Sequence, residues 1–78
     1  MGSRGQIGWR DLFDAISRCA EDVRWDLKTH TRVVYANGKV YPTLPKYDQL
    51  AIGHVKSLIR NLGIDADCVK KYLPALNC

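Results

Sequence analysis

The sequence lacks any long apolar run. Although 46% of its 78 residues are hydrophobic, no stretch reaches the roughly 18 apolar residues typical of a membrane-spanning helix. The first eight residues, MGSRGQIG, also lack the apolar centre of a signal peptide. We therefore expect a cytoplasmic protein with no membrane partner, a flexible segment over residues 1–8 and one domain over residues 9–78.

Cysteine is scarce and widely spaced. Cys19, Cys68 and Cys78 include no C-x-x-C pair, and their odd number argues against a disulfide framework and against a zinc site. We expect reduced thiols that pack as small hydrophobic groups. A nucleophilic pair of His30 and Cys68 is disfavoured, because nothing in the sequence orients the two side chains together.

Acidic residues are the minority among the charged ones. Twelve Lys and Arg face eight Asp and Glu, which gives a net charge of +4 and favours a polyanionic partner such as nucleic acid. A chain this short buries only about 60 to 65% of its surface on folding. We therefore expect an active site to be a surface groove and not an enclosed cavity.

Apolar residues recur at helical spacing directly after the first eight residues. They are Trp9, Leu12, Phe13, Ile16 and Cys19 or Ala20. This pattern predicts an amphipathic helix of about three turns. Residues 23–27 alternate apolar and polar side chains, which predicts a half-buried strand. We expect Trp9 and Trp25 to lie in the core.

A hairpin is predicted around Asn37-Gly38. These two residues separate the β-rich runs 32–35 and 39–44, and both tolerate the positive φ of a two-residue type I′ turn. Pro42 and Pro45 cannot donate to a ladder, so the third strand is expected at an edge of the sheet or ends there.

The second half of the chain predicts two further helices. Val55, Leu58, Ile59 and Leu62 form one apolar stripe, and Gly63 suits a left-handed C-terminal cap. Asp65 can cap a short helix that ends before Pro74. The expected fold is α+β: a three-stranded antiparallel sheet with helices packed on one face, and the other face free for a partner.

Several residues lie at distances that resemble a known family. His30 precedes Gly38 of the turn by eight residues, and Gly53 follows that glycine by fifteen, opening the segment Gly53-His54-Val55-Lys56-Ser57-Leu58-Ile59-Arg60 before Leu62-Gly63-Ile64. Over roughly residues 9–73 the chain resembles the HicA family of small bacterial mRNA-cleaving toxins. That family has a Gly-Ser-His on its second strand, an Asp-Gly or Asn-Gly turn and a similar helix.

The resemblance implies a fold like that of a double-stranded-RNA-binding domain (dsRBD), in the order α-β-β-β-α. It also implies that His30 is the catalytic residue of a ribonuclease that needs neither a metal nor a small-molecule cofactor, and that a HicB-like antitoxin neutralises the enzyme in a stress-response toxin–antitoxin system. Imidazole, with an ordinary pKa near 6.5, can move protons to and from a ribose at neutral pH.

The chain departs from the family pattern next to the histidine. Lys28 and Thr29 stand where the family has glycine and serine; Thr29 keeps a hydroxyl, and Lys28 can stabilise a developing phosphate charge. Lys46 and Tyr47 follow Pro45, where many members have a second histidine. These changes leave open a catalytically inactive RNA-binding or protein-interaction module of the same fold.

Other side chains are candidates for RNA contact. Lys56 and Arg60 lie four residues apart on one helix face and, with Lys46, can contact backbone phosphates, although a solvated helix face has the same pattern. Tyr35, Tyr41 and Tyr47 can stack on unpaired bases or pack against helices. His54 is expected to face solvent in the first turn of its helix.

Overall fold

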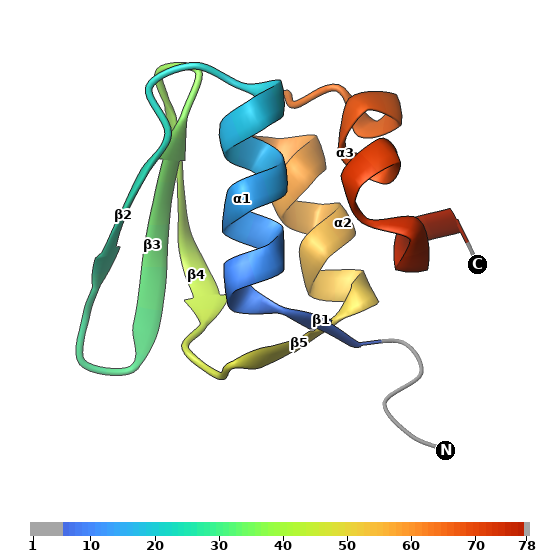
Figure 1. The fold of residues 1–78 in the computed structure, drawn as a ribbon. Helices are drawn as coiled ribbons and strands as arrows, with labels where there is room; N and C mark the ends of the chain where they lie inside the picture. The colour runs from blue at the N-terminus through green and yellow to red at the C-terminus, as the bar shows by residue number, and fades with distance from the viewer. Residues whose placement is uncertain (1–5, 78) are drawn as a thin grey trace.

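The computed structural model describes residues 6–77, which form an α+β fold around a three-stranded antiparallel sheet (Figure 1). The elements are β1 (Gln6–Gly8), α1 (Trp9–Cys19), β2 (Arg24–Leu27), β3 (Thr31–Ala36), β4 (Lys39–Pro45), β5 (Gln49–Ala51), α2 (Ile52–Asn61), α3 (Ala66–Tyr72) and the 3-10 helix η1 (Pro74–Asn77). In Figure 1 the sheet β2-β3-β4 lies on the left and the three α-helices lie to its right. The predicted α+β class is confirmed.

Helix α1 follows the apolar stripe predicted from the sequence. Leu12, Ala15 and Ile16 are fully buried and join the core with residues of β3, β4, α2 and α3. The opposite face carries an exposed ion pair between Arg18 and Asp14, 3.1 Å apart and four residues apart in the chain. This division of apolar and charged residues explains why α1 packs with one side inward.

The β3–β4 hairpin turns at Asn37-Gly38, as predicted. Their φ angles of 54° and 76° are the positive values that a type I′ turn requires. The Asn37 side chain also holds the turn against the helical layer: its Oδ1 accepts from the Glu21 N–H at 3.0 Å, and its Nδ2 donates to the Leu62 carbonyl at 3.3 Å.

Strand β4 lies at an edge of the sheet, in the order β2-β3-β4. This confirms the position predicted from Pro42 and Pro45, which cannot donate to a neighbouring strand. The register of β3 against β4 shifts between Arg32 and Val34. Such an irregularity changes which side chains of a strand face the core.

The end of helix α2 and both ends of helix α3 lie at the residues that the sequence marks. Val55 and Leu58 are fully buried on the predicted stripe of α2. Gly63, just past the helix, has a φ of 66°, which is a left-handed conformation that glycine adopts without steric cost. Asp65 caps α3, because its side chain accepts from the Asp67 N–H at 3.0 Å.

A short antiparallel ribbon of β1 and β5 was not predicted. Ile7 pairs with Leu50 in this ribbon, and both side chains are buried. The Trp9 N–H donates to the Asp48 carbonyl at 2.8 Å, which joins the start of α1 to the same segment. Residues 6–8, expected in the N-terminal tail, therefore belong to the fold; residues 1–5 lie outside the described part.

A disulfide joins Cys19 at the end of α1 to Cys68 in α3, with a Cα–Cα distance of 5.8 Å. The expectation that these two thiols are reduced is therefore wrong for this structure. Their separation of 49 residues hides the pairing from local sequence patterns, since it depends on α1 and α3 lying side by side. Cys78 lies outside the described residues.

Strand β2 is more exposed than its alternating sequence suggests. All four residues, Arg24–Leu27, are exposed, and Trp25 retains 42% of its surface. The prediction that Trp25 lies in the core is therefore wrong, whereas Trp9 is buried as predicted, with 8% exposed. Alternation shows which residues share a face, but it does not show whether another element covers that face.

Among residues 6–77, no helix is both long enough and apolar enough to cross a lipid bilayer.

Candidate nucleic-acid interface

One charged side chain of the sheet is buried between aromatic rings. Arg32 on β3 is 5% exposed, and its guanidinium carbon lies 4.1 Å from the ring centre of Trp9 and 5.3 Å from that of Trp25. The two indole rings meet edge to face, with centroids 5.3 Å apart. Ring faces attract a cation electrostatically, so these contacts offset part of the cost of burying the guanidinium.

The charge of Arg32 persists in this position. Burial lowers the pKa of Arg32 below its usual value, and the carboxylate of Asp48 opposes that shift. A guanidinium nevertheless stays protonated at neutral pH. The residue therefore acts as a fixed cation that joins β3 to α1, through Trp9, and to β2, through Trp25.

Arg32 also holds the segment that follows β4. Its Nη1 donates to the carbonyls of Pro45 and Tyr47 at 3.4 and 3.3 Å, and its Nη2 donates to the carbonyl of Lys46 at 3.5 Å. Three successive carbonyls thus surround one guanidinium. This arrangement fixes the backbone that carries Lys46.

The turn between β2 and β3 carries three of the predicted site residues. Lys28, Thr29 and His30 are all exposed there. The Lys28 N–H donates to the Thr31 carbonyl at 2.8 Å, which closes the turn. The Nζ of Lys46 donates to the Thr29 carbonyl, also at 2.8 Å. We call Lys28, Thr29, His30 and Lys46 the turn site.

The turn site is basic and accessible. The family pattern implies a histidine within the second strand, but His30 lies in the turn between β2 and β3, at the end of the sheet. The Nζ of Lys28 lies 3.5 Å from a carboxylate oxygen of Asp26. Since both side chains are more than half exposed, this ion pair is weak, and Lys28 can turn to a phosphate. Lys46 keeps two ammonium hydrogens for the same purpose.

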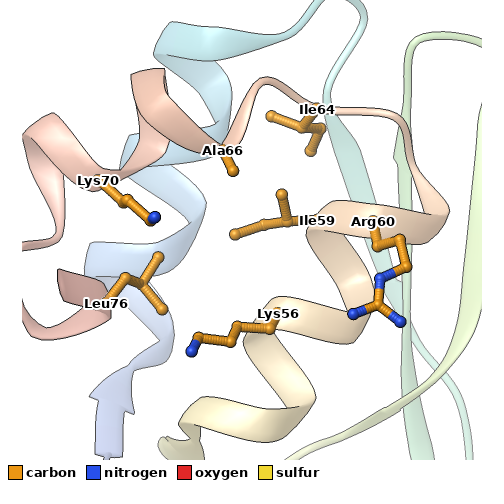
Figure 2. A pocket seen from close by; sticks show the side chains of 7 residues that line it. All are labelled: Lys56, Ile59, Arg60, Ile64, Ala66, Lys70 and Leu76. Carbon is orange, nitrogen blue, oxygen red and sulfur yellow. The ribbon is translucent and has the colours of Figure 1, made fainter. Parts of the chain in front are cut away.

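The structure does not bring Lys56 and Arg60 into the turn site. They line a hollow of about 430 Å³ beside α2, together with Ile59, Ile64, Ala66, Lys70 and Leu76 (Figure 2). Figure 2 shows Lys56 on α2 and Lys70 on α3 extending toward the space between the two helices, near Ile59 and Leu76, whereas the side chain of Arg60 lies on the side of α2 away from α3. In Figure 1 the β2–β3 turn lies at the lower left end of the sheet, and α3 lies at the upper right. The two basic surfaces are therefore separate.

The remaining candidate side chains are spread over the surface. His54 is exposed in the first turn of α2, as predicted. Tyr47 is 71% exposed and lies next to Lys46 in the chain. Tyr35 lies under the guanidinium of Arg24, 4.9 Å from it, and Tyr41 packs against the core. Of the three tyrosines, Tyr47 is thus the one placed to stack on a base near the turn site.

The sequence analysis did not identify two residues that matter here: Arg32, which supports the turn site, and Lys70, which lines the hollow. Arg32 shares a period-two face with Val34 and Ala36, and both of these are fully buried, so the alternation did contain a signal that Arg32 points inward. Lys70 carried no such signal. Its place in the hollow depends on how α3 lies against α2.

The described residues contain no group of three or more His, Cys, Asp or Glu side chains that could hold a metal ion. Comparisons with protein-family models, with curated proteins and with solved structures found no match.

Proposed function

We propose that this chain is a metal-independent endoribonuclease of the HicA type that cleaves single-stranded mRNA at the turn site. The observation that carries the proposal is an exposed His30 in a turn that also contains Lys28 and whose Thr29 carbonyl accepts from the ammonium group of Lys46. The chain order α1-β2-β3-β4-α2 supports the dsRBD-like fold that the resemblance implies. The β1–β5 ribbon and α3 are additions to that order.

The proposed reaction is a transesterification within the RNA chain. His30 takes the proton of a ribose 2′-hydroxyl, the 2′-oxygen bonds to the adjacent phosphorus, and the bond from phosphorus to the 5′-oxygen breaks. The leaving oxygen takes up a proton from the imidazolium or from water. The products are a 2′,3′-cyclic phosphate and a 5′-hydroxyl end. Lys28 and Lys46 stabilise the negative charge that develops on the phosphate oxygens.

Arg32 is a positioning residue in this scheme. It does not reach the RNA, because it is buried under the two tryptophans. It fixes the carbonyls of residues 45–47, and Lys46 in turn donates to Thr29. A rigid turn site reduces the freedom that must be lost when the scissile phosphate is aligned.

The α2–α3 hollow is the proposed second contact with the RNA backbone. Lys56, Arg60 and Lys70 line it without an acidic neighbour among the lining residues, and each cation that neutralises a phosphate releases counterions. Replacement of Lys56 by Gln should therefore weaken binding to all RNA sequences alike. It should also reduce the slope of log binding constant against log salt concentration by about one.

A HicB-like antitoxin is the proposed protein partner. By covering the turn site it would exclude RNA from His30 and silence the toxin. The proposed location is the cytoplasm, where mRNA is found. The Cys19–Cys68 disulfide opposes this location, because cytoplasmic thiols are kept mostly reduced. The redox state of Cys19 and Cys68 in freshly lysed cells, trapped by alkylation, tests this location: a complete disulfide indicates an oxidising compartment.

A catalytically inactive RNA-binding module is the second candidate. One observation favours it: within residues 6–77 no hydrogen bond orients the imidazole of His30, whereas a catalytic base is usually held by a partner group. Such a module uses the same basic surfaces and binds RNA without cleaving it.

Two histidine variants separate these functions. Purified protein is incubated with end-labelled RNA and EDTA, as wild type, as His30→Ala and as His54→Ala, the last a matched control because both imidazoles are exposed. The nuclease requires cleavage by wild type and His54→Ala, loss of cleavage in His30→Ala, and RNA affinity within about twofold in all three. Binding without cleavage in all three supports the inactive module. Absence of salt-sensitive binding contradicts both.

A further inference from the structure

In the part of the chain that the structure describes, strand β2 has an outer edge whose backbone groups pair with no other strand. In the described sheet its one neighbour is β3, with Leu27 opposite Arg32 and Trp25 opposite Val34. The Lys28 N–H donates to the Thr31 carbonyl at 2.8 Å, so this pair is hydrogen-bonded. Because hydrogen-bonded and non-bonded pairs alternate in an antiparallel ladder, Arg24 and Asp26 direct their backbone groups to β3. Trp25 and Leu27 direct theirs outward.

The side chains of β2 divide cleanly between its two faces. Trp25 lies on the helix side, against Trp9, and Leu27 shares that face by alternation. These two side chains are 42% and 54% exposed. Arg24 and Asp26 lie on the other face, where Arg24 covers Tyr35 and Asp26 is 3.5 Å from Lys28. The edge thus has one apolar and one charged face.

We propose that β2 pairs with β2 of a second copy of this chain, in an antiparallel register centred on Trp25. Outward backbone groups occur at every second residue, so the registers that bond them are centred on Arg24, on Trp25 or on Asp26. A pair centred on Arg24 sets two guanidinium groups against each other, and one centred on Asp26 sets two carboxylates against each other. Like charges directly opposite destabilise a sheet.

The register centred on Trp25 is complementary on both faces. It places Arg24 of each copy opposite Asp26 of the other, twice by symmetry, on the charged face. On the apolar face Trp25 meets its own copy, and Leu27 meets Val23, which is partly buried just before the strand. The self-pair would create a six-stranded sheet with the helices of both copies on one side. In the isolated chain the Leu27 N–H instead bonds the Asp26 carboxylate at 2.9 Å.

Sedimentation equilibrium over a wide range of protein concentration tests the proposal. Wild type should pass from the monomer to the dimer mass. Arg24→Asp and Asp26→Arg should each weaken the dimer about tenfold or more, because each turns two attractive pairs into repulsive ones. Lys71→Asp, an equal charge change on the exposed face of α3, should leave the dimer within about twofold.

Complementary variants give the decisive outcome. In an equimolar mixture, β2 of the Arg24→Asp variant carries two carboxylates and β2 of the Asp26→Arg variant carries two guanidinium groups. The mixed dimer pairs these opposite charges, so it should regain at least the wild-type affinity. The double variant should also dimerise. A wild type that stays monomeric at all concentrations overturns the proposal. So does a dimer that neither single variant weakens, or single variants whose mixture shows no recovery.

Discussion

The disulfide between Cys19 and Cys68 gives the most direct prediction about stability. Replacement of both residues by serine removes a cross-link between positions 49 residues apart. A loop of that length restricts the unfolded chain enough to stabilise the fold by about 4 kcal/mol on the chain-entropy estimate. At about 0.05–0.15 kcal/mol per residue, 78 residues give a total of about 4–12 kcal/mol. The double variant should therefore lose a third or more of its stability.

Urea unfolding followed by circular dichroism measures this loss. Oxidised wild type and Cys78→Ser should unfold at the same urea concentration, and Cys19→Ser/Cys68→Ser should unfold at a concentration lower by at least about 1 M. Wild type with a reducing agent should match the double variant. Alkylation of the denatured, unreduced protein should modify one of its three cysteines. Modification of all three, or an unchanged midpoint after reduction, would contradict the structure.

Three further substitutions test the fold by the same urea assay. Arg32→Ala should lower the free energy of unfolding by about 2–4 kcal/mol, because it removes two cation–π contacts and empties a buried site. A loss below about 1 kcal/mol would show that Arg32 does not hold residues 45–47 in place. Gly63→Ala should cost about 1–2 kcal/mol for its φ of 66°; an unchanged midpoint would refute the left-handed cap. Asp65→Ala should cost about 1 kcal/mol through loss of the α3 cap, and an unchanged midpoint would contradict this cap.

Local backbone chemistry explains which parts of the fold were predictable. The turn at Asn37-Gly38, the left-handed Gly63 and the Asp65 cap all depend on residues within a few positions of each other. Neighbours in the chain determine such features, and they appear in the structure at the predicted residues. The buried stripes of α1 and α2 were predictable for the same reason, since helical spacing alone places them on one face.

Features that depend on distant segments were not predictable. The Cys19–Cys68 disulfide and the β1–β5 ribbon both join residues more than 40 positions apart. The exposure of Trp25 depends on how much of its ring Trp9 and Arg32 cover in the folded chain. Each required knowledge of which elements lie side by side, and alternation or cysteine spacing carries no such information.

The candidate site was predictable only where its residues are neighbours in the chain. Lys28, Thr29 and His30 are consecutive, so a single turn collects them, and Lys46 joins them through its contact with Thr29. Lys56 and Arg60 are one helical turn apart, as their spacing indicates, but they line the hollow beside α2 and not the turn site. The role of Arg32 as a support for residues 45–47 depends on the folding of three elements around one guanidinium.

The chemistry of the RNA ends tests the central claim about His30 most directly. The assay compares the all-ribose RNA with an RNA that has one 2′-deoxyribose on the 5′ side of a preferred cleavage position. Both are incubated in EDTA, and the new 3′ ends are analysed by mass spectrometry. We predict 2′,3′-cyclic phosphate ends from the all-ribose RNA, no cleavage at the deoxyribose, and no products with His30→Ala. Equal products from His30→Ala and wild type, or cleavage at the deoxyribose, would contradict the account.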